Sequence, residues 1–381
     1  MRVLVVNSGS SSLKLRLLDA DSAGSAGPND GAGPNDGAGP NDAVLWRHDA
    51  AAPAELSDDE LTAMFDEAPE ADAVGHRVVH GGPDLRGPTL IDDAVLEQLD
   101  ALTALAPLHQ PPALRLIRMV TAARPELPNV ACFDTSFHRT IPPAAETYPI
   151  PEAWRKSYPI RRYGFHGLSH QWAARRAAEL AGSQPQRLVV CHLGAGSSLS
   201  AVRNGHCVDT TMGFTPLEGL MMATRSGDVD PGLVLWLIRH AGIAPDEVEH
   251  RLVHESGLLG MAGQADMRTV LNLADAGDEA AALAVDVYQH RLRAGIAAMV
   301  ASLGGLDTLV FTGGVGEHAW QVRSRAAEDL AFLGVRIDAA TNHGAVPDAE
   351  LTDGGAAVRT FLIEAREDLE ISRDTRLLLT V

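Results

Sequence analysis

Cysteine is scarce in this sequence, and its spacing excludes a disulfide framework. Only Cys132, Cys191 and Cys207 occur among 381 residues, and no two of them form a Cys-x-x-Cys pair. A small secreted domain held together by disulfides would carry more cysteines, in an even number and at closer spacing. We therefore expect three buried free thiols in a protein of a reducing compartment.

Long apolar runs and a surplus of basic residues are absent as well. No stretch reaches the roughly 20 consecutive apolar residues that a membrane-spanning helix needs. The apolar start of the chain is interrupted by Asn-Ser-Gly, unlike a secretory signal. Lys and Arg number 31 against 50 Asp and Glu, so the formal net charge is −19, whereas a nucleic-acid-binding surface is basic. These absences predict a cytoplasmic protein that binds neither membranes nor nucleic acids.

What remains is the composition of a globular α/β protein with two domains. A chain of 381 residues exceeds what one core usually supports, and 45% hydrophobic with 21% charged residues is typical of a folded protein. Apolar residues at helical spacing predict helices over 91–107, 231–241, 279–305 and 367–379. A buried strand is expected over 306–312. Strands and helices that alternate in this way indicate the α/β class.

A hexapeptide repeat stands apart from the rest of the chain. Ala-Gly-Pro-Asn-Asp-Gly occurs in tandem over residues 26–43, with Ala as the last residue of the third copy. Pro, Asn, Asp and Gly at this density disfavour both helix and sheet. We predict a mobile loop over 24–43 that joins two strands, with the sheet resuming at 44–50. Calcium binding is the alternative, but the spacing is not that of an EF-hand.

Three glycine-rich turns follow apolar strands, at 7–12 (NSGSSS), 192–198 (HLGAGSS) and 312–318 (TGGVGEH). Neither the P-loop pattern nor the dinucleotide-binding Gly-x-Gly-x-x-Gly is present. Glycine and small hydroxyl residues allow backbone N–H groups to approach a ligand closely, as phosphate binding requires. The first two turns share Gly-Ser-Ser, which indicates a duplicated unit with two places where phosphate oxygens are held.

Nine stretches, in one order along the chain, resemble the motifs of the acetate kinase family. They are VNSGSSSLK (6–14), GHRVVHGG (75–82), LAPLH (105–109), FDTSFH (133–138), YGFHGLSH (163–170), CHLGAGSS (191–198), GFTPLEGLM (213–221), TRSGDVDPG (224–232) and FTGGVGEH (311–318). The resemblance implies an α/β fold of two ribonuclease-H-like, actin-like ATPase domains related by duplication, with the active site in the cleft between them.

The same resemblance implies the extent of the two domains. The N-terminal domain would span 1–150 and be completed by a C-terminal helix at about 368–381. The nucleotide-binding domain would span 151–367, after a boundary in the proline-rich stretch near residue 150. The repeat at 24–43 departs from the family, but it lies in a connection where added length costs little.

The implied reaction is the reversible transfer of the γ-phosphoryl group of ATP to acetate, which gives acetyl phosphate and ADP by direct in-line transfer. Mg²⁺, with Mn²⁺ as an alternative, is the implied cofactor, ATP and ADP are substrates, and a homodimer is the implied assembly. A propionate or butyrate kinase is the alternative within the family. A non-catalytic nucleotide switch of the actin or chaperone kind is the alternative outside it, and such a protein would lack an acceptor-site arginine.

The chemistry of the acceptor directs attention to arginines. A small carboxylate has a pKa about three units below neutrality, so it needs no strong base but must approach another anion. A permanently charged, bidentate guanidinium is suited to that task. The resemblance implies that Arg77 holds the acetate carboxylate and that Arg225 and His166 stabilise the transferring phosphoryl group. Asp134 matches the catalytic aspartate, and we expect it to position the acceptor or its arginine, or to tune a nearby metal, rather than to act as a base.

The resemblance also implies the remaining site residues. Asn7 and Glu367 match the magnesium site, although Arg-Glu-Asp stands at 366–368 where the family usually has Asn-Glu-Glu. The apolar lining of the methyl pocket matches Val79, Leu108, Phe165 and Pro216. The nucleotide contacts match Ser10, Ser12, Lys14, His192, Gly194, Ala195, Gly196, Asp266, Met267, Arg268, Gly314, Val315, Gly316, Glu317 and His318. Ala195 replaces the usual Asn, and Met267 replaces a Phe.

Paired histidines raise a zinc alternative. His76 and His80 are four residues apart, as are His166 and His170. That spacing forms a metal-binding face on a helix, but the stretch around His76 is strand-like. Hydrogen-bonded structural histidines are the simpler interpretation of His76, His80 and His170.

Overall fold

The computed structural model describes residues 1–9, 12–20, 43–107 and 109–380. Nearly all of the predicted loop at 24–43 lies outside the described residues. Two compact units make up the chain. The first comprises Met1–Phe137, His166–Trp172 and Arg366–Val381, and the second comprises His138–Phe165 and Ala173–Ala365. The predicted boundary near residue 150 falls inside 138–165, so the domain limits drawn from the sequence stay a prediction.

The first unit is built on a six-stranded sheet in the order β3-β2-β1-β4-β6-β5. Its strands are β1 (Arg2–Ser8), β2 (Leu13–Asp19), β3 (Ala43–Ala50), β4 (Ala73–Val78), β5 (Thr89–Leu90) and β6 (Asn129–Phe133). β1, β2 and β3 form an antiparallel meander, as expected for a sheet that resumes at 44–50. β4 and β6 continue it in parallel with β1.

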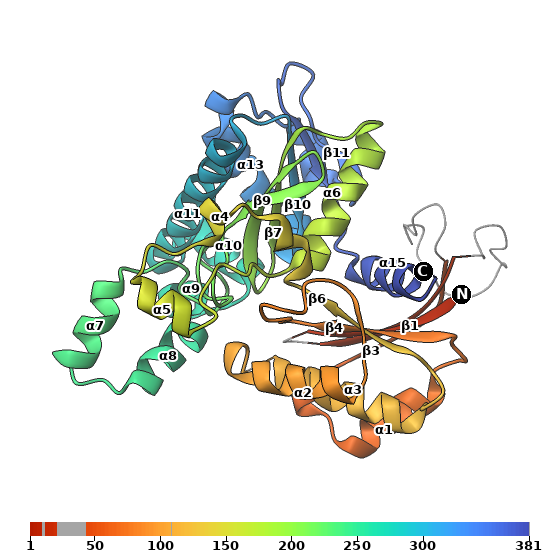
Figure 1. Cartoon of the computed structure of the whole chain (residues 1–381). Coiled ribbons are helices and arrows are strands. Elements are labelled where there is room, and N and C mark those ends of the chain that lie inside the picture. The colour runs from red at the N-terminus through yellow and green to blue at the C-terminus, as the bar shows by residue number, and fades with distance from the viewer. Residues whose placement is uncertain (10–11, 21–42, 108, 381) are drawn as a thin grey trace. The chain divides into compact units, whose positions relative to one another are not determined.

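Helices cover both faces of this sheet. In Figure 1, α1 (Asp58–Glu67), α2 (Asp93–Ala101) and α3 (Gln110–Ala123) lie on one face and α15 (Glu367–Leu379) lies on the other. α15 packs against β1, β4 and β6. Gly75 allows this close approach, since a Cβ at that position would lie 2.5 Å from Thr375 Oγ1. Short 3-10 helices occur at Pro53–Glu55, Leu102–Leu105 and Ser136–Thr140.

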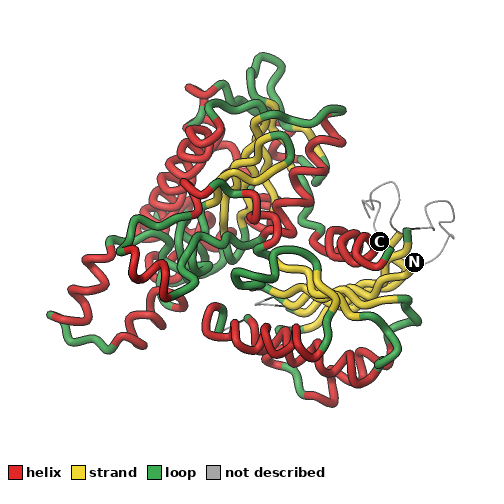
Figure 2. Tube along the Cα trace, viewed as in Figure 1, coloured by secondary structure: helices red, strands yellow, loops and turns green. Residues whose placement is uncertain are grey.

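The second unit has its own six-stranded sheet, in the order β11-β12-β10-β7-β8-β9. Its strands are β7 (Arg187–Leu193), β8 (Ser197–Arg203), β9 (His206–Thr210), β10 (Thr308–Thr312), β11 (Ala349–Glu350) and β12 (Arg359–Leu362). Figure 2 shows the strands of this sheet in yellow with helices in red around it.

Most helices of the chain belong to the second unit, and the long α11 packs against β7, β8 and β9. The helices are α4 (Pro143–Glu146), α5 (Glu152–Ser157), α6 (Gly167–Ala181, which begins in the first unit), α7 (Pro231–Arg239), α8 (Pro245–His254), α9 (Gly257–Ala262), α10 (Met267–Asp275), α11 (Glu279–Leu303), α12 (Gly313–His318), α13 (Trp320–Asp329), α14 (Ala339–Gly344) and a 3-10 helix at Ala331–Leu333.

The two sheets have one topology. When the second is written as β9-β8-β7-β10-β12-β11, each strand matches β3-β2-β1-β4-β6-β5 in order and direction. The Gly-Ser-Ser stretches that the sequence repeats join the matching pairs β1–β2 and β7–β8. This correspondence confirms the predicted duplication and the α/β class.

Two element predictions need correction. The helix expected over 91–107 ends as α2 at Ala101 and continues as a 3-10 helix, because apolar spacing does not separate the two helix types at a helix end. The glycine-rich stretch after β10 is the short helix α12 and not a turn. Gly313, with φ of 78°, redirects the chain, and its N–H donates to Glu317 Oε1 at 3.1 Å.

Other elements follow the sequence closely. Helices begin where predicted at Pro231, Glu279 and Glu367. Gly304, with φ of 72°, ends α11, as glycine commonly does after a helix. None of the described helices is long and apolar enough to cross a membrane.

Candidate functional site

In the first unit, polar side chains gather where three neighbouring parallel strands end. Asn7 lies near the end of β1, Arg77 near the end of β4, and Asp134 directly after β6. Because the carboxyl ends of parallel strands meet at one edge of a sheet, these residues come together. α15 adds its first residue, Glu367, to the same edge.

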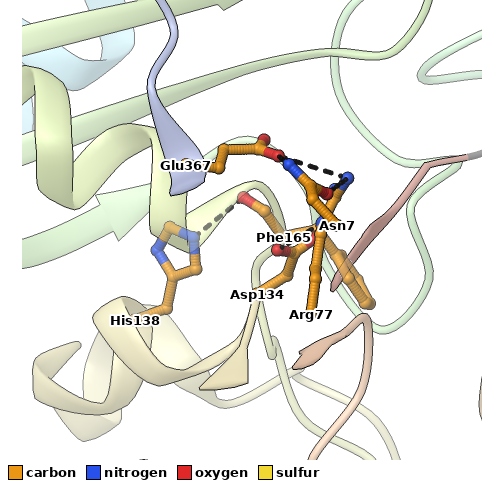
Figure 3. A network of polar contacts seen from close by, with 6 residues as sticks. All are labelled: Asn7, Arg77, Asp134, His138, Phe165 and Glu367. Atoms are coloured by element: carbon orange, nitrogen blue, oxygen red, sulfur yellow. Dashed lines mark hydrogen bonds and ion pairs between the residues drawn. The ribbon is translucent and has the colours of Figure 1, made fainter. Parts of the chain in front are cut away.

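Arg77 is the centre of this group (Figure 3). Its Nε lies 3.0 Å from Asp134 Oδ1, and its Nη2 lies 2.7 Å from Asp134 Oδ2, a bidentate ion pair. Nη1 lies 3.3 Å from Glu367 Oε2 and 3.4 Å from Asn7 Oδ1. Asn7 Nδ2 donates to Glu367 Oε2 at 2.9 Å. Four of the residues that the sequence assigned to acceptor, catalysis and metal therefore form one hydrogen-bonded cluster: Asn7, Arg77, Asp134 and Glu367.

Burial shapes the electrostatics of the cluster. Asp134 is 1% exposed, and burial raises the pKa of its carboxyl although the Arg77 guanidinium opposes the rise. Burial alone would lower the pKa of Arg77, but the charges of Asp134 and Glu367 outweigh it and raise that pKa. Two acidic side chains, those of Asp134 and Glu367, thus contact the one guanidinium of Arg77.

The donor set of the cluster fits a hard divalent cation. Carboxylate and amide oxygens are the ligands that Mg²⁺ prefers, and Mg²⁺ keeps several water ligands, so one or two protein carboxylates suffice. In the described part of the chain, no group of three or more His, Cys, Asp or Glu side chains forms a ready-made metal site. Asn7 and Glu367 are thus compatible with a metal held mainly through water.

The second unit contains a cavity of about 640 Å³. It lies beside the turn between β7 and β8, the start of α10, and the α12–α13 segment. A cavity of this size holds a ligand of nucleotide dimensions. Eight of the predicted nucleotide residues line it: Gly194, Ala195, Asp266, Met267, Arg268, Gly314, Val315 and His318.

The remaining nucleotide predictions are placed differently. His192, Gly196, Gly316 and Glu317 belong to the same segments but are not among the residues that line the cavity. Ser12 and Lys14 belong to the first unit, and Ser10 lies outside the described residues. Nine further lining residues were not anticipated: Ala223, Leu258, Ala265, Leu271, Asn272, Tyr288, Ala319, Trp320 and Gln321. Trp320 and Gln321 follow the predicted GGVGEH stretch so closely that extending it would have found them.

Asp266, which directly precedes α10, also has a structural role at the start of that helix. Its Oδ1 accepts from Thr269 N at 2.9 Å and from Thr269 Oγ1 at 2.8 Å, so it caps α10. This cap lowers the pKa of Asp266. The capped helix presents Met267 and Arg268 to the cavity.

Arg225 lies on a segment whose backbone is hydrogen-bonded to the lining of the cavity. Ala223, which lines the cavity, donates its N–H to Ala195 O at 3.2 Å, and Met222 N donates to Arg225 O at 3.1 Å. Arg225 Nη1 donates to Pro216 O at 3.1 Å. Among the described residues no carboxylate forms an ion pair with it, and burial lowers the pKa of its guanidinium. A partly buried cation without a carboxylate partner in the described part of the chain is suited to receive an anion.

The loop that carries Pro216 is braced by a polar cluster that sequence reasoning missed. Tyr148 Oη donates to Glu218 Oε2, Arg162 Nη2 pairs with Glu218 Oε1, and Phe214 N donates to Tyr148 Oη at 2.9 Å. A Cβ at Gly213 would lie 1.7 Å from Glu218 Oε2 and 2.0 Å from Tyr148 Oη, so it would displace these two side chains. This bracing fixes the carbonyl that Arg225 contacts.

Of the other predicted residues, Val79 and Phe165 are buried and His166 is partly buried. Val79 follows β4 in the first unit with 6% exposure, and Phe165 in the second unit is 1% exposed. Leu108 lies outside the described residues. His166 has φ of 56°, a left-handed conformation that is uncommon for a residue other than glycine.

The zinc alternative finds no support among the described residues. His76 Nε2 lies 2.8 Å from Asn129 Oδ1, and His80 Nδ1 accepts from Gly82 N at 2.8 Å. Both histidines are buried, and burial lowers the pKa of each to about 4. They behave as hydrogen-bonded structural residues.

Comparisons with known proteins find relatives that match nearly the whole chain. The model of the acetokinase family matches residues 2–373. An acetate kinase from Synechococcus sp. (strain JA-2-3B'a(2-13)) is 44% identical over 395 residues, which cover 98% of each chain. Among solved structures, a propionate kinase from Francisella tularensis subsp. tularensis SCHU S4 has a TM-score of 0.86 at 33% identity, and an acetate kinase from Porphyromonas gingivalis has 0.82 at 31%. Each match covers 99% of both chains.

Proposed function

The chain belongs to the acetokinase family and is a phosphotransferase with a carboxyl group as acceptor, and we propose how its residues transfer the γ-phosphoryl group of ATP to acetate. Acetate kinase activity is favoured over propionate or butyrate kinase activity because full-length relatives named acetate kinase match this chain at 40–44% identity. Acetyl phosphate and ADP are the products, and the transfer is reversible.

One observation carries the proposal: Arg225 is a partly buried guanidinium without a carboxylate partner among the described residues, on a segment hydrogen-bonded to the cavity lining. Phosphoryl transfer requires stabilisation of charge on the equatorial oxygens of the transferring group. Arg225 supplies that charge without first breaking an ion pair. The cavity in the second unit would hold the nucleoside, and the glycine-rich turn at 194–196 would offer backbone N–H groups to the phosphates.

Arg77 would bind the acceptor. Asp134 occupies the edge of the guanidinium formed by Nε and Nη2. The end formed by Nη1 and Nη2 retains N–H groups that can engage a carboxylate in a bidentate pair. Acetate is already an anion at neutral pH, so Asp134 acts by orienting Arg77 and not by removing a proton.

Asn7 and Glu367 would hold Mg²⁺, or Mn²⁺ in its place. The bound ion supplies charge neutralisation at the phosphate oxygens. Glu367 Oε2 contacts Arg77 Nη1 at 3.3 Å, so engagement of Glu367 elsewhere leaves Arg77 free for the acceptor. The carboxylate of Glu367 and the amide of Asn7, which lie 2.9 Å apart, support this assignment, since Mg²⁺ prefers oxygen ligands of these kinds.

His166 would donate a hydrogen bond to the transferring phosphoryl group. The apolar residues Val79, Phe165 and Pro216 would surround the methyl group of acetate, and a pocket of this kind discriminates by about 1–3 kcal/mol per methylene. In-line transfer requires the acceptor oxygen to lie about 3–3.5 Å from the γ-phosphorus.

Assembly and location complete the proposal. A homodimer is supported by α7, which exposes Leu233, Leu235 and Trp236, the latter two by 51% and 55%. Apolar side chains on one helix at such exposure are typical of a protein–protein interface. A reducing, cytoplasmic location is supported by the three buried free thiols.

Trapping of acyl phosphate with hydroxylamine tests the assignment of both arginines. We expect Arg225→Met to lower kcat by about 10³-fold or more while ADP still binds in calorimetry. Arg77→Ala should lose saturation with acetate. Arg118→Ala, a half-exposed arginine on α3, is the matched control and should keep the wild-type rate. Normal acetyl phosphate formation by Arg225→Met would contradict the proposal.

A further inference from the structure

A buried histidine outside the proposed machinery is hydrogen-bonded at both ring nitrogens. His138 lies in the 3-10 helix at Ser136–Thr140 and is 1% exposed. Its Nε2 lies 2.9 Å from Phe165 O, and its Nδ1 lies 3.2 Å from Cys207 Sγ. Figure 3 shows the imidazole directed at the Phe165 carbonyl. That carbonyl belongs to the peptide bond that leads into His166.

The bonds around the imidazole define its tautomer. Burial lowers the pKa of His138 to about 4, so the ring is neutral and carries one N–H near neutral pH. A carbonyl oxygen only accepts, so the proton is on Nε2 and Nδ1 is the acceptor. Burial raises the pKa of Cys207, so the thiol keeps its proton and can donate to Nδ1. Asp209 O, at 3.3 Å from Cys207 Sγ, is the alternative acceptor for that proton.

His166 itself is fixed on both sides through the backbone. On its N-terminal side, Phe165 O is held by His138. On its C-terminal side, Gly167 N donates to Asp134 O at 2.8 Å. Both anchors therefore come from the single stretch FDTSFH (133–138). His166 needs them because its φ of 56° is costly for a residue with a Cβ.

The glycine two residues before His166 allows the backbone to pass close to the same imidazole ring. Gly164 has φ of 74°, and a Cβ there would lie 2.5 Å from His138 Cγ and Cδ2. The segment 164–166 thus follows the surface of the His138 imidazole closely. Replacement or movement of that ring would therefore displace the backbone that leads into His166.

We propose that His138 is a positioning residue for phosphoryl transfer: it holds His166 in its left-handed conformation through the carbonyl of Phe165, and Cys207 selects the imidazole tautomer that makes this possible. The inference rests on the role proposed above for His166. His138 touches no reacting atom in this scheme.

Two substitutions at His138 separate the donor from the volume of the ring. The amide nitrogen of His138→Gln occupies the position of Nε2 and keeps the donor to Phe165, whereas the amide of His138→Asn reaches only the position of Nδ1. We expect His138→Asn to lower kcat by about 10- to 100-fold, as small misplacements of reacting groups do. His138→Gln should stay within about threefold of wild type, and KM for ATP should change little in either variant.

The thiol is tested with a matched pair. Cys207→Ala removes the donor to Nδ1 and should lower kcat in the same direction as His138→Asn, while Cys207→Ser, which keeps an O–H donor, should restore it. Cys191→Ala removes an equally buried thiol that has no hydrogen-bond partner among the described residues, and it controls for cavity formation. Circular dichroism and thermal unfolding report whether each variant is folded.

A double-mutant cycle decides the mechanism. If His138 acts through His166, then His138→Asn lowers kcat no further in a His166→Ala background. Equal losses from His138→Asn in both backgrounds would overturn the inference, as would unchanged kcat in folded His138→Asn and Cys207→Ala. A His166→Ala enzyme with wild-type kcat would instead refute the role proposed for His166, so the two failures are distinguishable.

Discussion

Removal of Arg77 should destabilise the protein, and the loss should depend on pH. The side chain is 13% exposed and makes a bidentate ion pair with Asp134 in addition to its contact with Glu367. Arg77→Ala leaves two carboxylates buried without their cation. Breaking one side of a buried pair typically costs about 3–5 kcal/mol, a large share of the total stability of about 5–15 kcal/mol.

The direction of the pH effect follows from the carboxyl of Asp134. Its pKa is raised in the folded protein by burial, and Arg77 opposes that rise. Without Arg77 the folded pKa is higher still, so the protonated form of Asp134 contributes stability at low pH that is lost as pH rises through that pKa. The deficit of Arg77→Ala should therefore be largest at pH 8 and smaller at pH 5.

Urea unfolding at both pH values measures this effect. Arg225→Met is the matched control, because Arg225 has no carboxylate partner among the described residues and its loss should leave stability within about 1 kcal/mol. In the double variant Arg77→Ala with Asp134→Asn, the losses should be less than additive by about 0.5–3 kcal/mol. A deficit below about 1 kcal/mol, or one that does not change with pH, would refute the reasoning.

Three further predictions address other parts of the molecule. Glu218→Gln removes the charge that Arg162 neutralises and loosens the loop that holds Arg225, so kcat should fall by about tenfold with KM for ATP unchanged; steady-state kinetics decide this. Trp320 lines the cavity, so ADP titration should change tryptophan fluorescence in wild type and not in Trp320→Leu; an equal change in both would place the nucleotide elsewhere. Gly75→Ala should destabilise by about 1–3 kcal/mol in urea unfolding, because its Cβ would lie 2.5 Å from Thr375 Oγ1; unchanged stability would show that α15 can move away.

The fold could be predicted from the sequence wherever the local sequence patterns were strong. Repetition of Gly-Ser-Ser after an apolar strand predicted the duplication, and the matching order of the two sheets confirms it. Apolar spacing predicted the starts of α7 and α11 at Pro231 and Glu279, where the structure has them. The helix α12 was missed because three glycines predict a turn, and no local pattern shows that Glu317 accepts hydrogen bonds from both Gly313 N and the distant Ala365 N.

The candidate site could be predicted from the sequence only in part. Motifs identified Asn7, Arg77, Asp134 and Glu367, although Glu367 is far from the others in sequence, and the structure brings them into one cluster. Bracing interactions were not accessible: the pairing of Tyr148 with Glu218 joins residues 70 apart. His138 was visible only as the last letter of FDTSFH, and its role depends on Phe165 and Cys207, which no local pattern connects to it.

The acceptor preference is the property on which the proposed function depends, and steady-state kinetics with saturating MgATP measure it. Acyl phosphate trapped with hydroxylamine gives kcat/KM for acetate, propionate and butyrate in one series. We expect acetate to have the highest value, propionate a lower one and butyrate the lowest. A higher kcat/KM for propionate or butyrate than for acetate, or no acyl phosphate from any of the three, would contradict the proposed activity.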